Sequence, residues 1–188
     1  MRVIAGSARG RRLRSLDSMG VRPTTDRLKE SLFSTLGPEI RGKRVLDLFA
    51  GSGALGIEAL SRGARHATFV DSSPPAIAMI KANLAATGLG ESAHVVRQKA
   101  EAFAAGDHPG GTEPFDLVLA DPPYETGIPA RALERLLTCG RLAPGAMVVV
   151  EVSSRLKELT PPLGYRLLDS RKYGDSKLLY LTEDEGGE

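Results

Sequence analysis

The chain has 188 residues, of which 41% are hydrophobic and 26% charged, with a formal net charge of +2. This length and composition predict one soluble globular domain. No apolar run approaches the ~20 residues that cross a bilayer, and the basic N-terminus has no apolar signal-peptide core. We therefore expect a cytoplasmic protein. The single cysteine, Cys139, excludes an internal disulfide and a cysteine-rich zinc site, and we expect it to be a small core residue near a helix end.

The charges are unevenly distributed along the chain. Residues 1–44 contain eleven lysines and arginines but only four acids, a net charge of +7, whereas residues 45–188 carry a net charge of −5. Such an asymmetry indicates a basic end that faces a polyanion. A solvated, flexible N-terminal arm is the alternative interpretation, and the sequence leaves both open.

The first predicted elements are a short hairpin and a helix. Residues 1–20 contain two short runs around a turn at Ala5-Gly6-Ser7, which predicts an N-terminal β-hairpin. The segment Arg22-Pro23-Thr24-Thr25 breaks the chain before the next element. Apolar residues at positions 28, 32, 33 and 36 have helical spacing, and Gly37-Pro38 ends that helix.

From Arg44 onward, apolar strand patterns alternate with helical patterns. This alternation predicts an α/β fold in which helices cover both faces of a parallel sheet. The β-rich runs 165–173 and 177–181 then predict a hairpin that closes the sheet with one antiparallel strand, and residues 183–188 form an acidic tail. The predicted strands lie near 44–49, 67–71, 93–98, 115–120 and 145–152, and the predicted helices near 54–62, 75–86, 99–105 and 129–139.

The first of these strands runs into a glycine loop, Gly51-Ser52-Gly53, and Gly56 completes a G-x-G-x-x-G pattern. Asp71 follows Gly51 by 20 residues at the end of the next strand, which fits a nucleotide-binding fingerprint with the acid on a ribose. Asp47 lies inside the strand end, where a carboxylate suits a cationic cofactor better than a pyrophosphate. S-adenosylmethionine has a sulfonium, an amine and a ribose diol. A capping role for Asp47 at the strand end remains the alternative.

The fourth strand ends in Asp121-Pro122-Pro123-Tyr124. Open α/β sheets place their chemistry at this end of the strands. The turn offers an acceptor carboxylate, the Pro122 carbonyl and an aromatic ring, which together suit a planar group with an exocyclic NH2. A proline-stiffened turn with a surface tyrosine is the alternative.

These motifs together resemble a class I, Rossmann-like methyltransferase that acts on an amino nitrogen. More narrowly, the chain resembles the bacterial RsmD family over residues 1–181. The segments that carry this resemblance are Arg2-Val3-Ile4-Ala5-Gly6, Arg9-Gly10-Arg11-Arg12-Leu13, the run from Arg22 to Phe33, the run from Asp47 to Gly56, and Tyr173-Gly174-Asp175.

The resemblance implies transfer of a methyl group from S-adenosylmethionine to the N2 of a guanine in 16S ribosomal RNA, within an assembling small subunit. It implies a basic RNA-docking extension at 1–22, a methyltransferase domain at 23–182 and the tail at 183–188. We expect a monomer and no metal site. The expected catalytic residues are Asp121, Pro122, Pro123 and Tyr124; the cofactor-binding residues Asp47, Phe49, Gly51, Ser52, Gly53, Asp71, Ser72, Ala100 and Glu101; and the RNA-binding residues Arg9, Arg11, Arg12, Arg14 and Arg22.

One position departs from the usual pattern. After the third strand, many class I methyltransferases place an acid against the adenine amine, whereas this chain has Lys99-Ala100-Glu101. Either Glu101 or a backbone group would take that role.

Three other functions remain open. An adenine-N6 methyltransferase acting on DNA or RNA would use the same D-P-P-Y turn, because adenine also presents an exocyclic NH2. An NAD-dependent oxidoreductase fits the glycine loop but not Asp47. A non-enzymatic ribosomal RNA-binding factor fits the basic end but not the intact site motifs.

Overall fold

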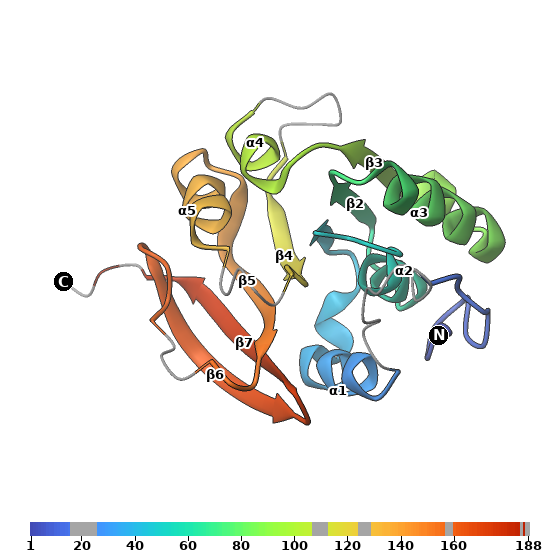
Figure 1. The fold of residues 1–188 in the computed structure, drawn as a ribbon, viewed down its shortest axis with the longest axis horizontal. Coiled ribbons are helices and arrows are strands. Elements are labelled where there is room, and N and C mark those ends of the chain that lie inside the picture. The colour runs from blue at the N-terminus through green and yellow to red at the C-terminus, as the bar shows by residue number, and fades with distance from the viewer. Residues whose placement is uncertain (16–25, 107–112, 124–128, 157–159, 185, 187–188) are drawn as a thin grey trace.

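A seven-stranded sheet forms the centre of the computed structural model (Figure 1). The structure describes residues 1–15, 26–106, 113–123, 129–156, 160–184 and 186. Its strands are β1 (Arg44–Leu48), β2 (His66–Asp71), β3 (Ala93–Arg97), β4 (Phe115–Ala120), β5 (Leu142–Ser153), β6 (Tyr165–Tyr173) and β7 (Ser176–Glu183).

The strand order is β3-β2-β1-β4-β5-β7-β6. The first five strands in this order pair in parallel. The strand β7 lies between β5 and β6 and runs antiparallel to both. The α/β fold with one antiparallel strand, predicted from the alternating pattern, is confirmed.

Helices cover both faces of the sheet, as Figure 1 shows. The helices α1 (Asp26–Leu36), α2 (Ala54–Ser61) and α3 (Pro74–Thr87) share one apolar cluster, and α4 (Ala100–Ala105) and α5 (Ala130–Thr138) share the other. Two short 3-10 helices, η2 (Gly37–Ile40) and η3 (Gly90–Ser92), precede β1 and β3. The central strands are therefore buried on both sides, which explains their nearly continuous apolar sequences.

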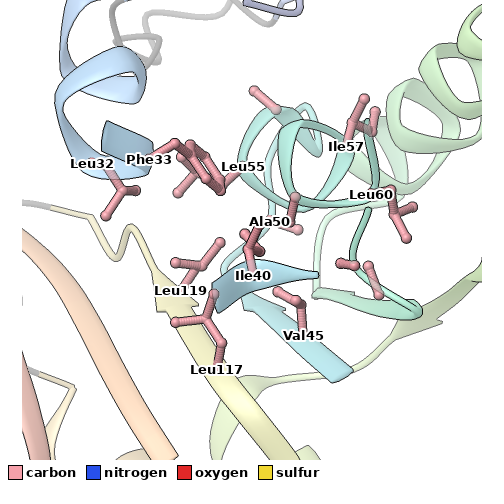
Figure 2. Close-up of a cluster of buried hydrophobic side chains, with 14 of the residues drawn as sticks. Leu32, Phe33, Ile40, Val45, Ala50, Leu55, Ile57, Leu60, Leu117 and Leu119 are labelled. Atoms are coloured by element: carbon pink, nitrogen blue, oxygen red, sulfur yellow. The ribbon is translucent and has the colours of Figure 1, made fainter. Parts of the chain in front are cut away.

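The larger cluster joins α1 and α2 to the sheet (Figure 2). Leu32 and Phe33 of α1 lie near Leu119 of β4, and all three are at most 1% exposed. The helical spacing read from residues 28, 32 and 33 is thus the buried face of α1. No helix in the described part of the chain is long and apolar enough to cross a membrane.

The order of the strands places a switch point between β1 and β4. From β1 the chain winds outward through β2 to β3, and it then returns to β4 on the other side of β1. Adjacent connections leave the sheet in opposite directions at such a point, so a crevice forms at the carboxyl ends of the two strands. Asp47 and Asp121 belong to these two strand ends.

The prediction that Cys139 is a core residue is wrong, because this residue is exposed, but it does lie at a helix end as predicted. The buried face of α5 is formed by Ala132, Leu133 and Leu136, and position 139 would continue it in a longer helix. The helix ends at Thr138, however, and the chain turns away at Cys139 and Gly140.

The N-terminal segment 1–15 packs against the domain. An antiparallel bridge joins Arg2 to Arg12, which confirms a short hairpin, and Val3, Ala8 and Leu13 belong to the same buried cluster as α1 and α2. At Gly6 a Cβ atom would lie 1.7 Å from the Ser61 carbonyl oxygen, so only glycine allows this contact. The flexible-arm interpretation therefore does not apply to residues 1–15.

A buried ionic cluster fastens this segment to the helices. The carboxylate of Glu58, in α2, accepts hydrogen bonds from the backbone N–H groups of Ile4 (2.8 Å) and Ala5 (3.0 Å) and lies 3.6 Å from the Lys29 ammonium. Lys29 in turn donates to the Arg2 carbonyl. Both charged side chains are fully buried, and burial lowers the pKa of Lys29 although Glu58 and Asp26 oppose this effect.

We predict that Glu58→Gln lowers the free energy of unfolding by roughly 3–5 kcal/mol, because it leaves the Lys29 ammonium buried without its main counter-charge. Chemical denaturation measures the change. Glu39→Gln, an exposed substitution in η2, is the matched control and should change the stability by less than about 0.5 kcal/mol. Equal stability of the two variants would contradict the role of the buried pair.

Candidate active site

Asp47 is the buried carboxylate at the carboxyl end of β1, and it is 1% exposed. Its Oδ2 accepts a hydrogen bond of 2.8 Å from the backbone N–H of Gly56, in the first turn of α2. Burial, opposed by this bond, raises the pKa of Asp47 well above its ordinary value, and Asp121 and Asp71 raise it further. The strand-end capping role is therefore real, and the carboxylate also lies within a concentration of negative charge.

Gly56 is required by the contact between α2 and the sheet. A Cβ atom there would lie 2.3 Å from the Phe69 ring and 3.0 Å from Asp47 Oδ2. The third glycine of the G-x-G-x-x-G pattern thus allows the helix to approach β1 and β2, so that its N–H groups reach Asp47.

The glycine loop is held by Asp71, at the end of β2. Asp71 Oδ2 accepts from the Gly51 N–H at 2.9 Å, and its Oδ1 accepts from the Ser73 N–H at 2.8 Å. Just before this loop, Phe49 has a φ of 63°. This left-handed conformation costs on the order of 1–3 kcal/mol for a non-glycine residue, and such strain is concentrated at functional sites.

The turn after β4 lies beside the end of β1, because the Asp121 N–H reaches the Leu48 carbonyl at 3.4 Å. Asp121 is half-buried, Pro122 is buried and Pro123 is exposed. Asp47, Asp71 and Asp121 thus come from three adjacent strands at one edge of the sheet. Among the described residues, no group of histidines, cysteines or acids is arranged to hold a metal ion.

A pocket of about 470 Å³ opens at this edge. Its volume is within the range of small-molecule sites. Six of the residues that the motifs predicted line it: Phe49, Asp71, Ser72, Ala100, Glu101 and Pro123. Asp47, Gly51, Ser52, Gly53, Asp121 and Pro122 do not line it but lie on the same strand ends and loops.

Two predicted site residues, Tyr124 and Arg22, lie outside the described residues. Arg9, Arg11, Arg12 and Arg14 are all exposed on the N-terminal segment, and none of them lines this pocket.

The sequence did not single out several residues that line the pocket. Gln98 directly follows β3, so its position at the strand edge was a usable signal, and the sequence noted Lys99 only as part of the departure from the usual adenine-binding pattern. Pro129, Ala130 and Arg131 belong to the start of α5 and have no recognisable motif. They reach the pocket only because α5 packs against α4 on the same face of the sheet.

Asn83 was also missed, and it links the N-terminal segment to the glycine loop. Its side chain is 1% exposed and lies on α3. Its Nδ2 donates to the carbonyls of Arg14 (3.0 Å) and Ser52 (2.9 Å), and its Oδ1 accepts from the Arg14 N–H (2.8 Å). One buried amide thus holds the end of the basic segment against the loop that precedes α2.

A family model described as Conserved hypothetical protein 95 matches residues 1–182. The chain belongs to this family. The Ribosomal RNA small subunit methyltransferase D of Haemophilus influenzae is 39% identical over 175 residues, which cover 93% of this chain and 89% of that relative. The Escherichia coli K12 protein of the same name is 39% identical over 187 residues, which cover 99% and 92%. The resemblance to the RsmD family is confirmed.

Solved structures agree with this assignment. The Escherichia coli protein yhhF superposes with a TM-score of 0.84 at 34% identity, and the match covers 98% of both chains. A candidate SAM-dependent methyltransferase of Streptococcus mutans has a TM-score of 0.69 and covers 86% of this chain and 49% of its own. At 15% identity, this second likeness shows the fold alone. This family member is a methyltransferase with a class I, Rossmann-like fold.

We predict that Asp47→Asn stabilises this family member at neutral pH in the absence of ligands. The unfolded carboxyl ionises near pH 4, whereas the folded one holds its proton to higher pH, so wild-type stability falls as the pH rises between these two pKa values. Asparagine cannot ionise and its oxygen can still accept from Gly56. Unfolding measured at several pH values should show a gain at pH 7 that shrinks toward pH 4, and a net loss at pH 7 would contradict this account.

Proposed function

We propose that this protein transfers a methyl group from S-adenosylmethionine to the exocyclic N2 of a guanine in the 16S ribosomal RNA of the small subunit. The observation that carries the proposal is the set of three carboxylates, Asp47, Asp71 and Asp121, around the switch point and beside the pocket. The names of the Haemophilus and Escherichia relatives support ribosomal RNA as the substrate class.

The residues at the site fit S-adenosylmethionine. When bound, this cofactor supplies an electrophilic methyl group on a positively charged sulfur. Asp47 and Asp71 provide the negative potential that favours such a cation, and the glycine loop lets backbone groups approach its amino-acid part. Asp71 would hold the ribose hydroxyls. Ala100 and Glu101, at the start of α4, line the pocket where the adenine ring would lie.

Asp121 and the Pro122 carbonyl act on the guanine. The lone pair of the exocyclic nitrogen is conjugated with the ring, so the amine is a poor nucleophile. Two acceptors that bind its two hydrogens favour a more pyramidal nitrogen and direct its lone pair toward the methyl group. Such orientation accounts for up to ~7–11 kcal/mol of barrier in favourable systems. The nitrogen loses its proton after methyl transfer, to Asp121 or to water, and Tyr124 would stack on the base.

The N-terminal segment would position the RNA. We propose that residues 1–22 form the docking extension, in which Arg9, Arg11, Arg12, Arg14 and Arg22 contact phosphates, that residues 23–182 form the methyltransferase domain and that 183–188 form a tail. Phosphate contacts set the register of a nucleic acid without reading its sequence. The protein would work as a monomer in the cytoplasm, on RNA within an assembling small subunit.

The test is methyl transfer from labelled S-adenosylmethionine to 16S RNA, both free and in partly assembled small subunits from a strain that lacks the gene. We expect label in RNA, recovered as N2-methylguanosine after digestion to nucleosides. Label recovered as N6-methyladenosine, or preferential methylation of duplex DNA, would refute the guanine assignment and support the adenine-N6 alternative.

We predict that Asp121→Asn lowers the methyl-transfer rate about 100-fold, because one of the two acceptors is replaced by a group that also donates. Affinity for S-adenosylmethionine, measured by calorimetry, should change little. Asp116→Asn, at the opposite end of β4, is the matched control and should keep a nearly normal rate. An Asp121→Asn enzyme that lost cofactor affinity and rate together would place Asp121 in the cofactor site instead.

A further inference from the structure

The exposed face of α1 lies between two grooves that adjoin one another. One groove, of about 570 Å³, lies between α1 and the N-terminal segment, and its lining includes Arg2 and Arg9. The other, of about 510 Å³, lies between α1 and β6, and its lining includes Arg171 and Tyr173. Both share Arg27 of α1. The two grooves therefore flank the same exposed ridge of α1, and we call the surface that they form together the α1 track.

Positive charge predominates along the α1 track. Among the described residues that line it, five are arginines and two, Asp26 and Glu30, are acids; the arginines are Arg2, Arg9, Arg27, Arg62 and Arg171. Arg2 pairs loosely with Asp26 at 3.8 Å, and its side chain is 68% exposed. The remaining lining includes serine and threonine hydroxyls, which also donate to phosphate oxygens. This chemistry suits an extended polyanion.

Two of these arginines are held in place by the protein. Arg171 donates from Nη1 to Thr35 Oγ1 of α1 at 2.6 Å and from Nε to Asp169 at 2.7 Å. Arg62 donates from Nε to Glu58 at 2.8 Å, and its guanidinium lies 5.0 Å from the centre of the Phe33 ring. A guanidinium has five N–H donors, so donors remain for a ligand, and less side-chain entropy is lost on binding.

One end of the α1 track lies on the side of the sheet where the parallel strands have their carboxyl ends. Tyr173 pairs with Ser176 across the β6–β7 turn, and Ser176 pairs with Ser153, the last residue of β5. Ser153 lies beyond the carboxyl ends of β4 and β1, where Asp121 and Asp47 are found. The other end reaches the exposed Arg9 of the N-terminal segment. The α1 track thus extends from the N-terminal segment 1–15 toward the carboxyl ends of the parallel strands.

We propose that the α1 track binds the phosphate backbone of the substrate RNA next to the target nucleotide, with Arg27 and Arg171 as phosphate contacts. This inference rests on the proposed RNA substrate. It extends the docking surface from the N-terminal segment across α1 to the β6–β7 hairpin, so the RNA would reach Asp121 along a fixed path.

The test compares wild type with the double variant Arg27→Gln/Arg171→Gln. The probe is 16S RNA, free and in partly assembled small subunits, and its affinity is measured at several salt concentrations. Each lost phosphate contact should reduce the slope of log affinity against log salt by about 0.7–0.9, and affinity itself should fall about 10-fold or more. The RNA KM should rise while kcat and S-adenosylmethionine affinity stay near their wild-type values.

The matched control is Arg135→Gln/Arg166→Gln, which removes the same charge at exposed sites on α5 and at the far end of β6. It should keep the wild-type slope. Because Arg171 also bonds Thr35, thermal melting accompanies each variant, and Arg27→Gln alone repeats the test if the double variant is unfolded.

Suppose that wild type binds RNA with a steep salt dependence, and that Arg27→Gln/Arg171→Gln has the same RNA affinity and slope as Arg135→Gln/Arg166→Gln. This result would overturn the α1 track but not the proposed function. Wild type that neither binds nor methylates RNA refutes the proposed function as well. Duplex DNA is added as a competitor of RNA. If it displaces RNA from wild type as well as unlabelled RNA does, and if this displacement depends on Arg27 and Arg171, the assignment of the α1 track to RNA is overturned.

Discussion

The burial of Asp47 is the constraint on which the candidate site at the carboxyl ends of β1, β2 and β4 depends. A carboxylate with almost no solvent exposure is costly to ionise unless protein groups or a ligand replace its water. Here the Gly56 N–H provides one hydrogen bond, and the positive end of α2 adds a favourable potential. Asp71 and Asp121 act in the opposite direction and raise the pKa of Asp47. Without a ligand this arrangement carries an electrostatic cost, which a cationic cofactor would relieve.

Several local features serve this arrangement. Gly56 has no side chain because α2 must approach β1 and β2 closely, and Phe49 adopts a left-handed conformation in the turn directly after β1. The two prolines after Asp121 restrict the backbone where the base would bind. The left-handed Phe49 in particular costs stability, as is common for residues at functional sites.

A second buried polar system connects the basic surface with this site. Glu58 and Lys29 attach the N-terminal segment to α1 and α2, and Asn83 attaches its end to the glycine loop. These contacts keep the backbone that carries the exposed arginines in a defined position relative to the glycine loop. Over residues 1–15, the N-terminal segment therefore shares one buried cluster with α1, α2 and the sheet.

The sequence by itself determined the fold class, the glycine loop and the aspartates of the strand ends, because these depend on local periodicity and on short spacings along the chain. It also indicated the helical face of Leu28, Leu32 and Phe33. Only the tertiary structure decided that Asp47 is bonded to Gly56, that Cys139 is exposed where α5 stops, and that α5 reaches the pocket through Pro129.

The same holds for the docking of the N-terminal segment. Glu58 lies more than fifty residues from Ile4, and Asn83 lies 69 residues from Arg14. On α3, no local pattern distinguishes Asn83 from an exposed polar residue such as Lys81, and on α2 nothing in the sequence shows which partner the single charged residue, Glu58, will meet. Their burial follows from how α2 and α3 pack on one face of the sheet, and that packing is decided by contacts between segments far apart in the chain.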